Sequence, residues 1–222
     1  MKTKAFSLIE LLVVIAIISI LCALIFPTFH IAKTKAKIFN AQNDMASLIM
    51  AINSYENFYR TLPTTKISMS IAANYNGDIT YIDNSEVISI LMDLEVFGDG
   101  RDTVNKYHAK NPQQHKFLNA RLINNNISHG VGNDGIFRDP FGMPYIITLD
   151  ANFDDNTKDS FYSSPTISSN GVSGLIKKTE NDLDFYECHA NVMVWSFGPD
   201  KKINDKLPAN KGENRDNILS WK

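Results

Sequence analysis

The chain has little cysteine and no excess of positive charge, and both shortages restrict its function. Its 222 residues include only 2 Cys, too few for the disulfide-dense scaffold of a small secreted protein. Lys and Arg together number 22, against 24 Asp and Glu. Because proteins that bind nucleic acid usually carry a basic excess, we expect no nucleic-acid partner. With 11 Gly and 8 Pro, the chain is neither collagen-like nor low in complexity.

The common catalytic motifs are also missing. The sequence contains no HExxH, GxSxG, phosphate-binding Gly loop or CxxC. Cys188 and His189 are adjacent, and adjacent side chains on a strand point to opposite faces, so they cannot form a nucleophile–base pair. We therefore expect a protein that is not an enzyme.

One long uncharged segment lies near the N-terminus. No charged residue occurs in residues 11–29, and within residues 11–26 only Ser19 is polar. At a rise of 1.5 Å per residue, a helix over residues 6–29 is long enough to cross the ~30 Å hydrocarbon core of a bilayer. The composition therefore predicts a membrane anchor followed by a globular head.

Two simple explanations of this segment are a removable signal peptide and a plain anchor. Signal-peptide cleavage needs small residues at −3 and −1, yet a cut after Ala23 places Leu21 at −3 and a cut after Ala32 places His30 there. A plain anchor explains every residue except Glu10. An acid within an apolar membrane segment is by default a functional candidate, although at the interface it can stay hydrated.

The third explanation rests on residues 2–21, KTKAFSLIELLVVIAIISIL. They resemble the N-terminal signature of type IV prepilins and type II secretion pseudopilins. The resemblance implies that a prepilin peptidase cuts between Ala5 and Phe6 and methylates the new amine; Ala5 stands where the family usually has Gly. Glu10 then becomes an assembly residue, because the Phe6 amine of a neighbouring subunit can neutralise its buried carboxylate.

Beyond the apolar segment the helix is predicted to continue as an amphipathic one over residues 30–60. Apolar residues recur there at steps of three and four and form one stripe: Ile38, Ala41, Met45, Leu48, Ile52, Tyr55 and Tyr59. Pro63 ends the helical pattern. The expected plan is a leader at 1–5, a transmembrane and assembly helix at 6–29, this continuation at 30–60 and a head at 61–222.

The head is predicted to be α+β. Strands are expected at 78–83, 144–149 and 191–197, and a short helix with Ser85 as its N-cap. Residues 97–116 read as loop and residues 154–170 as a polar surface excursion. The predicted fold is a long N-terminal transmembrane helical spine packed on a small antiparallel β-sheet head, as in pilins.

Three head segments extend the resemblance to the major pseudopilins of type II secretion: YRTLPTT at 59–65, DPFGMPY at 139–145, and WSFGPDKKIN followed by DNILSW within 195–221. In that family the loop after the last strand binds calcium, which takes six to eight oxygen ligands. The matching residues here are Asp200, Asp216 and Asn217, and Lys201 stands where the family commonly has Gly. Residues 75–134 have no counterpart in the compact major pseudopilins.

The resemblance implies a structural subunit of a type II secretion pseudopilus or type IV pilus-like filament. Its expected partners are other copies of itself, the prepilin peptidase, other pseudopilins and an inner-membrane assembly platform. It implies a single-pass protein of the bacterial inner membrane, with a cytoplasmic N-terminus and a periplasmic head. The alternative is a membrane-anchored periplasmic binding module, such as a minor pilin-like adhesin, whose ligand surface we would expect within residues 75–134.

Overall fold

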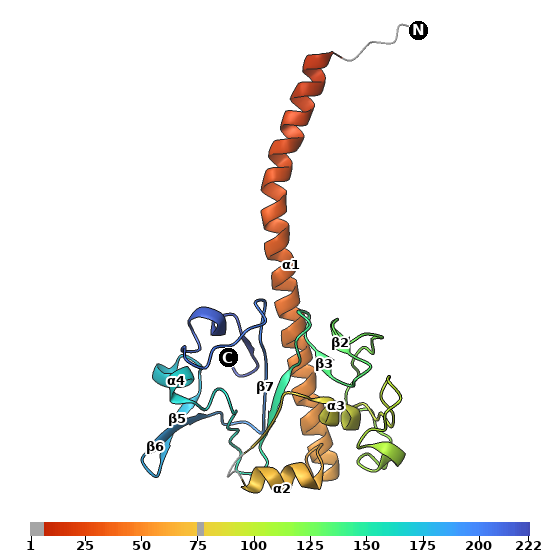
Figure 1. Cartoon of the computed structure of the whole chain (residues 1–222), viewed down its shortest axis with the longest axis vertical. Coiled ribbons are helices and arrows are strands. Elements are labelled where there is room, and N and C mark those ends of the chain that lie inside the picture. Colours follow the sequence, from red (N-terminus) through yellow and green to blue (C-terminus); the bar gives the residue numbers. More distant parts are fainter. Residues whose placement is uncertain (1–6, 75–77) are drawn as a thin grey trace. The chain divides into compact units, whose positions relative to one another are not determined.

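The computed structural model describes residues 7–74 and 78–222, and it has the predicted α+β architecture (Figure 1). A long helix, α1 (Leu8–Tyr59), is followed by short helices and small antiparallel sheets. The described chain divides into two compact units, one that extends to Lys37 and one at Ile38–Lys222. The second half of α1 is therefore part of the head unit.

The first unit contains the apolar part of α1 and ends in a basic stretch with Lys33, Lys35 and Lys37. The helix continues without a break through Pro27, and every described side chain in residues 8–23 is exposed. This helix is long and apolar enough to cross a membrane by its length and composition. Because apolar side chains surround this segment on all faces, it needs lipid or other helices around it.

The second half of α1 supplies one side of the head's core. The side chains that are buried recur at the predicted helical spacing: Ala41, Met45, Leu48, Ala51, Ile52 and Tyr55. Ile38 and Tyr59 are partly buried at the two ends of this stripe, which confirms the periodicity seen in the sequence. Complete burial of one such aliphatic side chain contributes about 1.5–3 kcal/mol, so this stripe is a major source of the head's stability.

A four-stranded antiparallel sheet packs against this stripe. Its order is β1 (Ile79–Tyr81), β4 (Ile146–Leu149), β7 (Val192–Ser196) and β8 (Ile218–Leu219). The three expected strands correspond to β1, β4 and β7. Alternate residues of β4 and β7 face opposite sides, so the sheet is covered on both faces. Ile147 and Val194 pack in the cluster that contains α1, whereas Ile146, Met193 and Trp195 belong to a second cluster.

The second cluster corrects the expectation that residues 154–170 form a surface excursion. Tyr162 and Asp159 are fully buried, and the short helix α4 (Pro165–Ser168) buries Ile167. The Asp159 Oδ2 accepts hydrogen bonds from the Thr148 hydroxyl at 2.7 Å and from the Trp195 indole at 3.1 Å. A long-range hydrogen-bond network thus brings this polar sequence into the core.

The remaining elements are short. They are α2 (Lys66–Asn74), α3 (Ser85–Leu91), β2 (Gly130–Val131), β3 (Phe137–Arg138), the hairpin of β5 (Ile176–Glu180) and β6 (Leu183–Glu187), and three 3-10 turns at Lys106–His108, Ser169–Gly171 and Gly212–Asn214. The sequence did not predict α2 or the hairpin. Residues 97–116 are mostly loop, as expected.

The N-cap of α3 was predicted wrongly. The helix begins at Ser85, so the cap position belongs to Asn84, whose side chain makes no capping bond. The Asn84 Nδ2 instead donates to the carbonyls of Phe137 and Tyr145, and its Oδ1 accepts the Phe137 N–H at 2.8 Å. Asn84 therefore ties the start of α3 to the segment that leads into β4.

Candidate functional site

Glu10 lies at the start of α1 and has a partner within its own chain. The Ser7 N–H donates to the Glu10 Oε2 at 2.8 Å, and the Glu10 N–H donates to the Ser7 Oγ at 3.2 Å. This reciprocal pair is a capping box, which satisfies two backbone donors that have no partner inside the helix. The S-x-x-E spacing of residues 7–10 indicates this box in the sequence, although only an assembly role was predicted for Glu10.

The capping box changes the electrostatic problem of Glu10 without removing it. One hydrogen bond, from the neutral Ser7 N–H, solvates the carboxylate, but it does not cancel the charge. The surrounding side chains of Leu8, Ile9 and Leu11 are exposed and apolar, so in a membrane or a helix bundle this acid would lie among apolar groups. A positive group from outside the chain would complete the site. The predicted processing residues, Ala5 and Phe6, lie outside the described residues.

The predicted calcium residues lie close together in the connection between β7 and β8. The Asp200 N–H donates to the Asp216 Oδ2 at 3.0 Å, and the Lys202 N–H donates to the Asp200 Oδ1 at 2.8 Å. Lys201 adopts a left-handed φ of 62°. Glycine is favoured in this conformation, which gives a physical reason for the Gly that the pseudopilin family commonly has at this position.

Asn217 is arranged differently from the two acids. Its Nδ2 donates to the Tyr162 hydroxyl at 2.8 Å, and its Oδ1 is buried without a hydrogen-bond partner in the described structure. Within residues 7–74 and 78–222, no group of three or more His, Cys, Asp or Glu side chains is placed to hold a metal ion. Asp200, Asp216 and Asn217 are hard oxygen donors that suit calcium, but a complete shell would also need backbone carbonyls and water.

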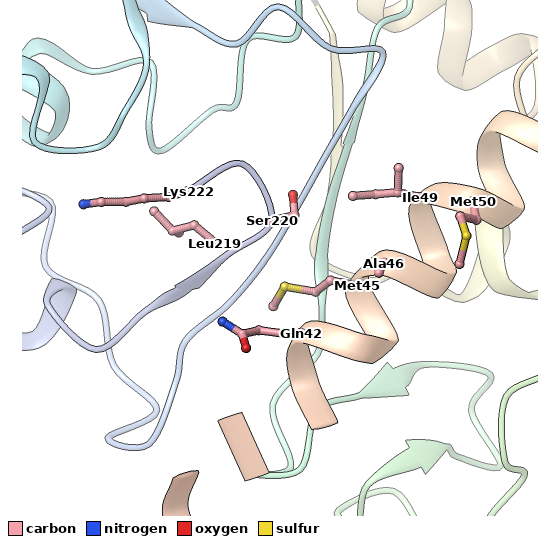
Figure 2. A pocket seen from close by; sticks show the side chains of 8 residues that line it. All are labelled: Gln42, Met45, Ala46, Ile49, Met50, Leu219, Ser220 and Lys222. Atoms are coloured by element: carbon pink, nitrogen blue, oxygen red, sulfur yellow. The ribbon is translucent and has the colours of Figure 1, made fainter. Parts of the chain in front are cut away.

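A groove lies between α1 and the C-terminal segment of the head (Figure 2). Its volume is about 410 Å³, and its lining residues come from these two segments: Gln42, Met45, Ala46, Ile49, Met50, Leu219, Ser220 and Lys222. Lys222 is the only charged residue among them. The groove therefore brings together no pair of titratable groups that could act as an acid and a base.

The polar groups of the head that resemble catalytic residues have structural partners. The His129 Nε2 and the Tyr145 hydroxyl both lie 2.7 Å from the Asp44 Oδ2, which links α1 to the sheet. Burial raises the pKa of the Cys188 thiol, so the reactive thiolate is disfavoured. These contacts explain the residues as parts of the fold.

Comparison with known proteins supports the resemblance found in the sequence. Residues 1–26 match the family model described as the prokaryotic N-terminal methylation motif, which is the type IV pilin and pseudopilin signature. No curated protein and no solved structure matches the chain. The match includes the predicted cleavage residues, the capping box and most of the apolar helix.

The capping box can be tested by the replacement Ser7→Ala. This change removes the hydroxyl that accepts the Glu10 N–H, and loss of such a cap costs about 1 kcal/mol. We expect hydrogen exchange of the Glu10 amide to become about fivefold faster, measured by NMR on the full chain in micelles. The control is Ser19→Ala, which removes a hydroxyl that donates to the Ile15 carbonyl and should leave Glu10 unchanged. Equal Glu10 exchange in wild type and Ser7→Ala would contradict the capping role.

Proposed function

We propose that this chain is a structural subunit of a type II secretion pseudopilus or a type IV pilus-like filament. The observation that carries the proposal is the N-terminal methylation motif at residues 1–26. In this proposal a prepilin peptidase removes residues 1–5 and methylates Phe6. Copies of the mature chain then polymerise through the apolar part of α1, together with other pseudopilins and an inner-membrane assembly platform.

The physical properties of α1 support this role. Its apolar residues 8–23 are exposed on all sides, which suits first a lipid environment and then a bundle of identical helices. The motif and this helix fit a protein anchored in the inner membrane. The proposed orientation places the N-terminus in the cytoplasm and the head in the periplasm. A pilin-type motif also indicates a structural protein and not an enzyme.

Processing can be tested by mass spectrometry of the membrane form. In cells with an active prepilin peptidase we expect a mature chain that begins at Phe6 and carries one added methyl group. Ala5→Leu should block cleavage, because a large side chain replaces the small residue before the cut. The matched control is Thr3→Ala, which changes the leader away from the cut and should be processed normally. An intact Met1 in wild type would refute the proposed processing.

The role of Glu10 in assembly can be separated from its role as a cap by Glu10→Gln. Glutamine keeps an oxygen that can accept the Ser7 N–H but loses the charge that would pair with a neighbouring amine. Breaking a buried ion pair costs about 3–5 kcal/mol, so we expect filament incorporation to fall by at least about tenfold at an unchanged membrane content. Sheared filaments and membranes can be compared by immunoblotting.

The control for this experiment is Glu56→Gln, which removes another carboxylate of α1 from the head unit. It should assemble like wild type. If Glu10→Gln also assembles at the wild-type level, the carboxylate does not pair with a neighbour and the filament model needs another source of register.

We further propose that the head binds calcium through Asp200 and Asp216, with Asn217 as a neighbouring amide donor. At a free calcium concentration of about 100 times Kd, binding adds about 2.7 kcal/mol of stability. For a chain of this size, chelation should then lower Tm by about 5–10 °C. Asp216→Asn should abolish this shift, whereas Asp205→Asn, an exposed acid of the same loop, should retain it. If the chelator leaves the Tm of the wild type unchanged, the head does not bind calcium.

The alternative function, a membrane-anchored binding module, is favoured by one feature of the head. Several large apolar side chains within residues 75–134 are exposed, namely Val96, Val104, Tyr107, Leu122 and Ile127. Such residues can serve ligand binding. Binding by a chain that never enters a filament would support this alternative over the filament role.

A further inference from the structure

His108 lies between two carboxylates in the head unit. Its Nδ1 is 2.9 Å from the Asp93 Oδ1, and its Nε2 is 3.3 Å from the Glu95 Oε1. A neutral imidazole has one N–H and one lone pair, so it can donate to only one of these oxygens while its lone pair faces the other. Both contacts are favourable only in the imidazolium form. The arrangement therefore depends on a proton on His108.

The backbone beside His108 is held in an unfavourable conformation. Tyr107 and His108 have consecutive left-handed φ values of 57° and 53°. Non-glycine residues persist there only when surrounding contacts hold them. The Tyr107 N–H donates to the Glu95 Oε2 at 2.8 Å, so Glu95 binds both the backbone and the imidazole of this strained pair. Loss of the Glu95 contacts would allow the strain to relax.

The two ends of the strained segment are fixed by side chains other than the imidazole of His108, although the Asn111 N–H also donates to the His108 carbonyl at 3.1 Å. The Asn105 Oδ1, in a fully buried side chain, accepts the N–H groups of Lys110 and Asn111 at 3.1 and 2.9 Å. Asn111 is also fully buried, and its Nδ2 donates to the His115 carbonyl at 2.6 Å. Residues 106–109 can therefore move between the fixed residues Asn105 and Lys110 without unfolding the head.

The two carboxylates are not equivalent. The Asp93 side chain is 7% exposed, and its Oδ1 also accepts a hydrogen bond from the Asn105 Nδ2 at 2.9 Å. The Glu95 side chain is 40% exposed and has the longer contact with His108. A neutral His108 would keep its one proton for Asp93 and present its lone pair to Glu95. The contact between His108 and Glu95 is thus the one that breaks when His108 loses its proton.

We propose that residues 106–109 form a pH-dependent latch, closed when protonated His108 bridges Asp93 and Glu95 and opened on the Glu95 side when His108 loses its proton. The latch controls the solvent exposure of the Tyr107 side chain, which is 81% exposed in the closed form. It is a property of the head unit and does not depend on filament assembly.

Other charged groups near the latch do not supply the switch. Lys106 pairs with Asp102, and its Nζ lies 5.3 Å from the centroid of the Tyr107 ring. The Lys110 carbonyl accepts the Tyr55 hydroxyl at 2.6 Å. Burial raises the pKa of Tyr55 to about 12, so Tyr55 stays neutral over the physiological range.

The sign of the pH effect follows from the acidic partners. The hydrogen bond to Asp93, with the negative charges of Asp93 and Glu95, raises the pKa of His108 above its ordinary value of 6.5. Stabilisation by the latch is fully present below pH 6.5 and is lost as the pH rises through the raised pKa. The closed form is therefore the populated form under mildly acidic conditions.

The test is hydrogen exchange of the Tyr107 amide in the full chain in micelles, between pH 5.5 and 8.5. After correction for the intrinsic pH dependence of exchange, we expect protection to fall at least threefold as His108 titrates. The imidazole nitrogen shifts of His108, followed by NMR in the same samples, should show the same midpoint. Unchanged corrected protection across this range in wild type would overturn the latch.

Two variants and a control sharpen the result. Glu95→Gln can present an amide N–H to neutral His108 and a carbonyl oxygen to the Tyr107 N–H, so its protection should no longer depend on pH. His108→Gln should also remove the dependence. The control, His115→Gln, replaces a histidine that stacks on Phe58. In this variant the protection of the Tyr107 amide should depend on pH as it does in the wild type. A pH dependence retained in His108→Gln would assign the effect to another group and refute the proposal.

Discussion

The constraint on which this protein depends is a single carboxylate at the head of a helix segment that is otherwise free of charge. At the centre of a bilayer an ionised acid costs at least ~2.5–3.5 kcal/mol, and the apolar neighbours of Glu10 offer it no positive partner. The Ser7 capping box gives the carboxylate one hydrogen bond, from the Ser7 N–H, and no positive charge. A carboxylate in this state still gains from pairing with a cation. In the proposed filament, the amine of a neighbouring subunit would supply that cation.

The same helix meets two different solvents along its length. Its residues 8–23 have apolar side chains on every face, whereas its second half concentrates them on one buried stripe that includes Leu48 and Ile52. The first pattern suits an apolar environment on all sides, and the second suits a helix that packs on one face of a folded head.

The sequence predicted those parts of the fold that periodicity dictates. The stripe on α1 and the strands β4 and β7 follow from local spacing, because side chains three to four apart share a helix face and alternate side chains share a sheet face. The β5–β6 hairpin was missed because β5 reads IKKTE and is exposed throughout, with no apolar alternation. The pairing of Asp200 with Asp216 followed only from the resemblance, since sixteen residues separate them. The capping box was readable in residues 7–10 but was overlooked.

What the sequence could not predict are the buried polar side chains that organise the head. Asn84 binds the backbone of Phe137 and Tyr145, and Asp159 binds Thr148 and Trp195; neither pattern is visible without the fold. Each such group is stable in the core only when its distant partner is present. A polar segment is therefore buried only where the fold brings its side chains to these hydrogen-bond partners. Many different pairs can solve this problem, whereas a membrane helix with one acid admits few solutions. The motif at residues 1–26 is instead readable from the sequence, because one acid beside a continuous apolar run is a local pattern.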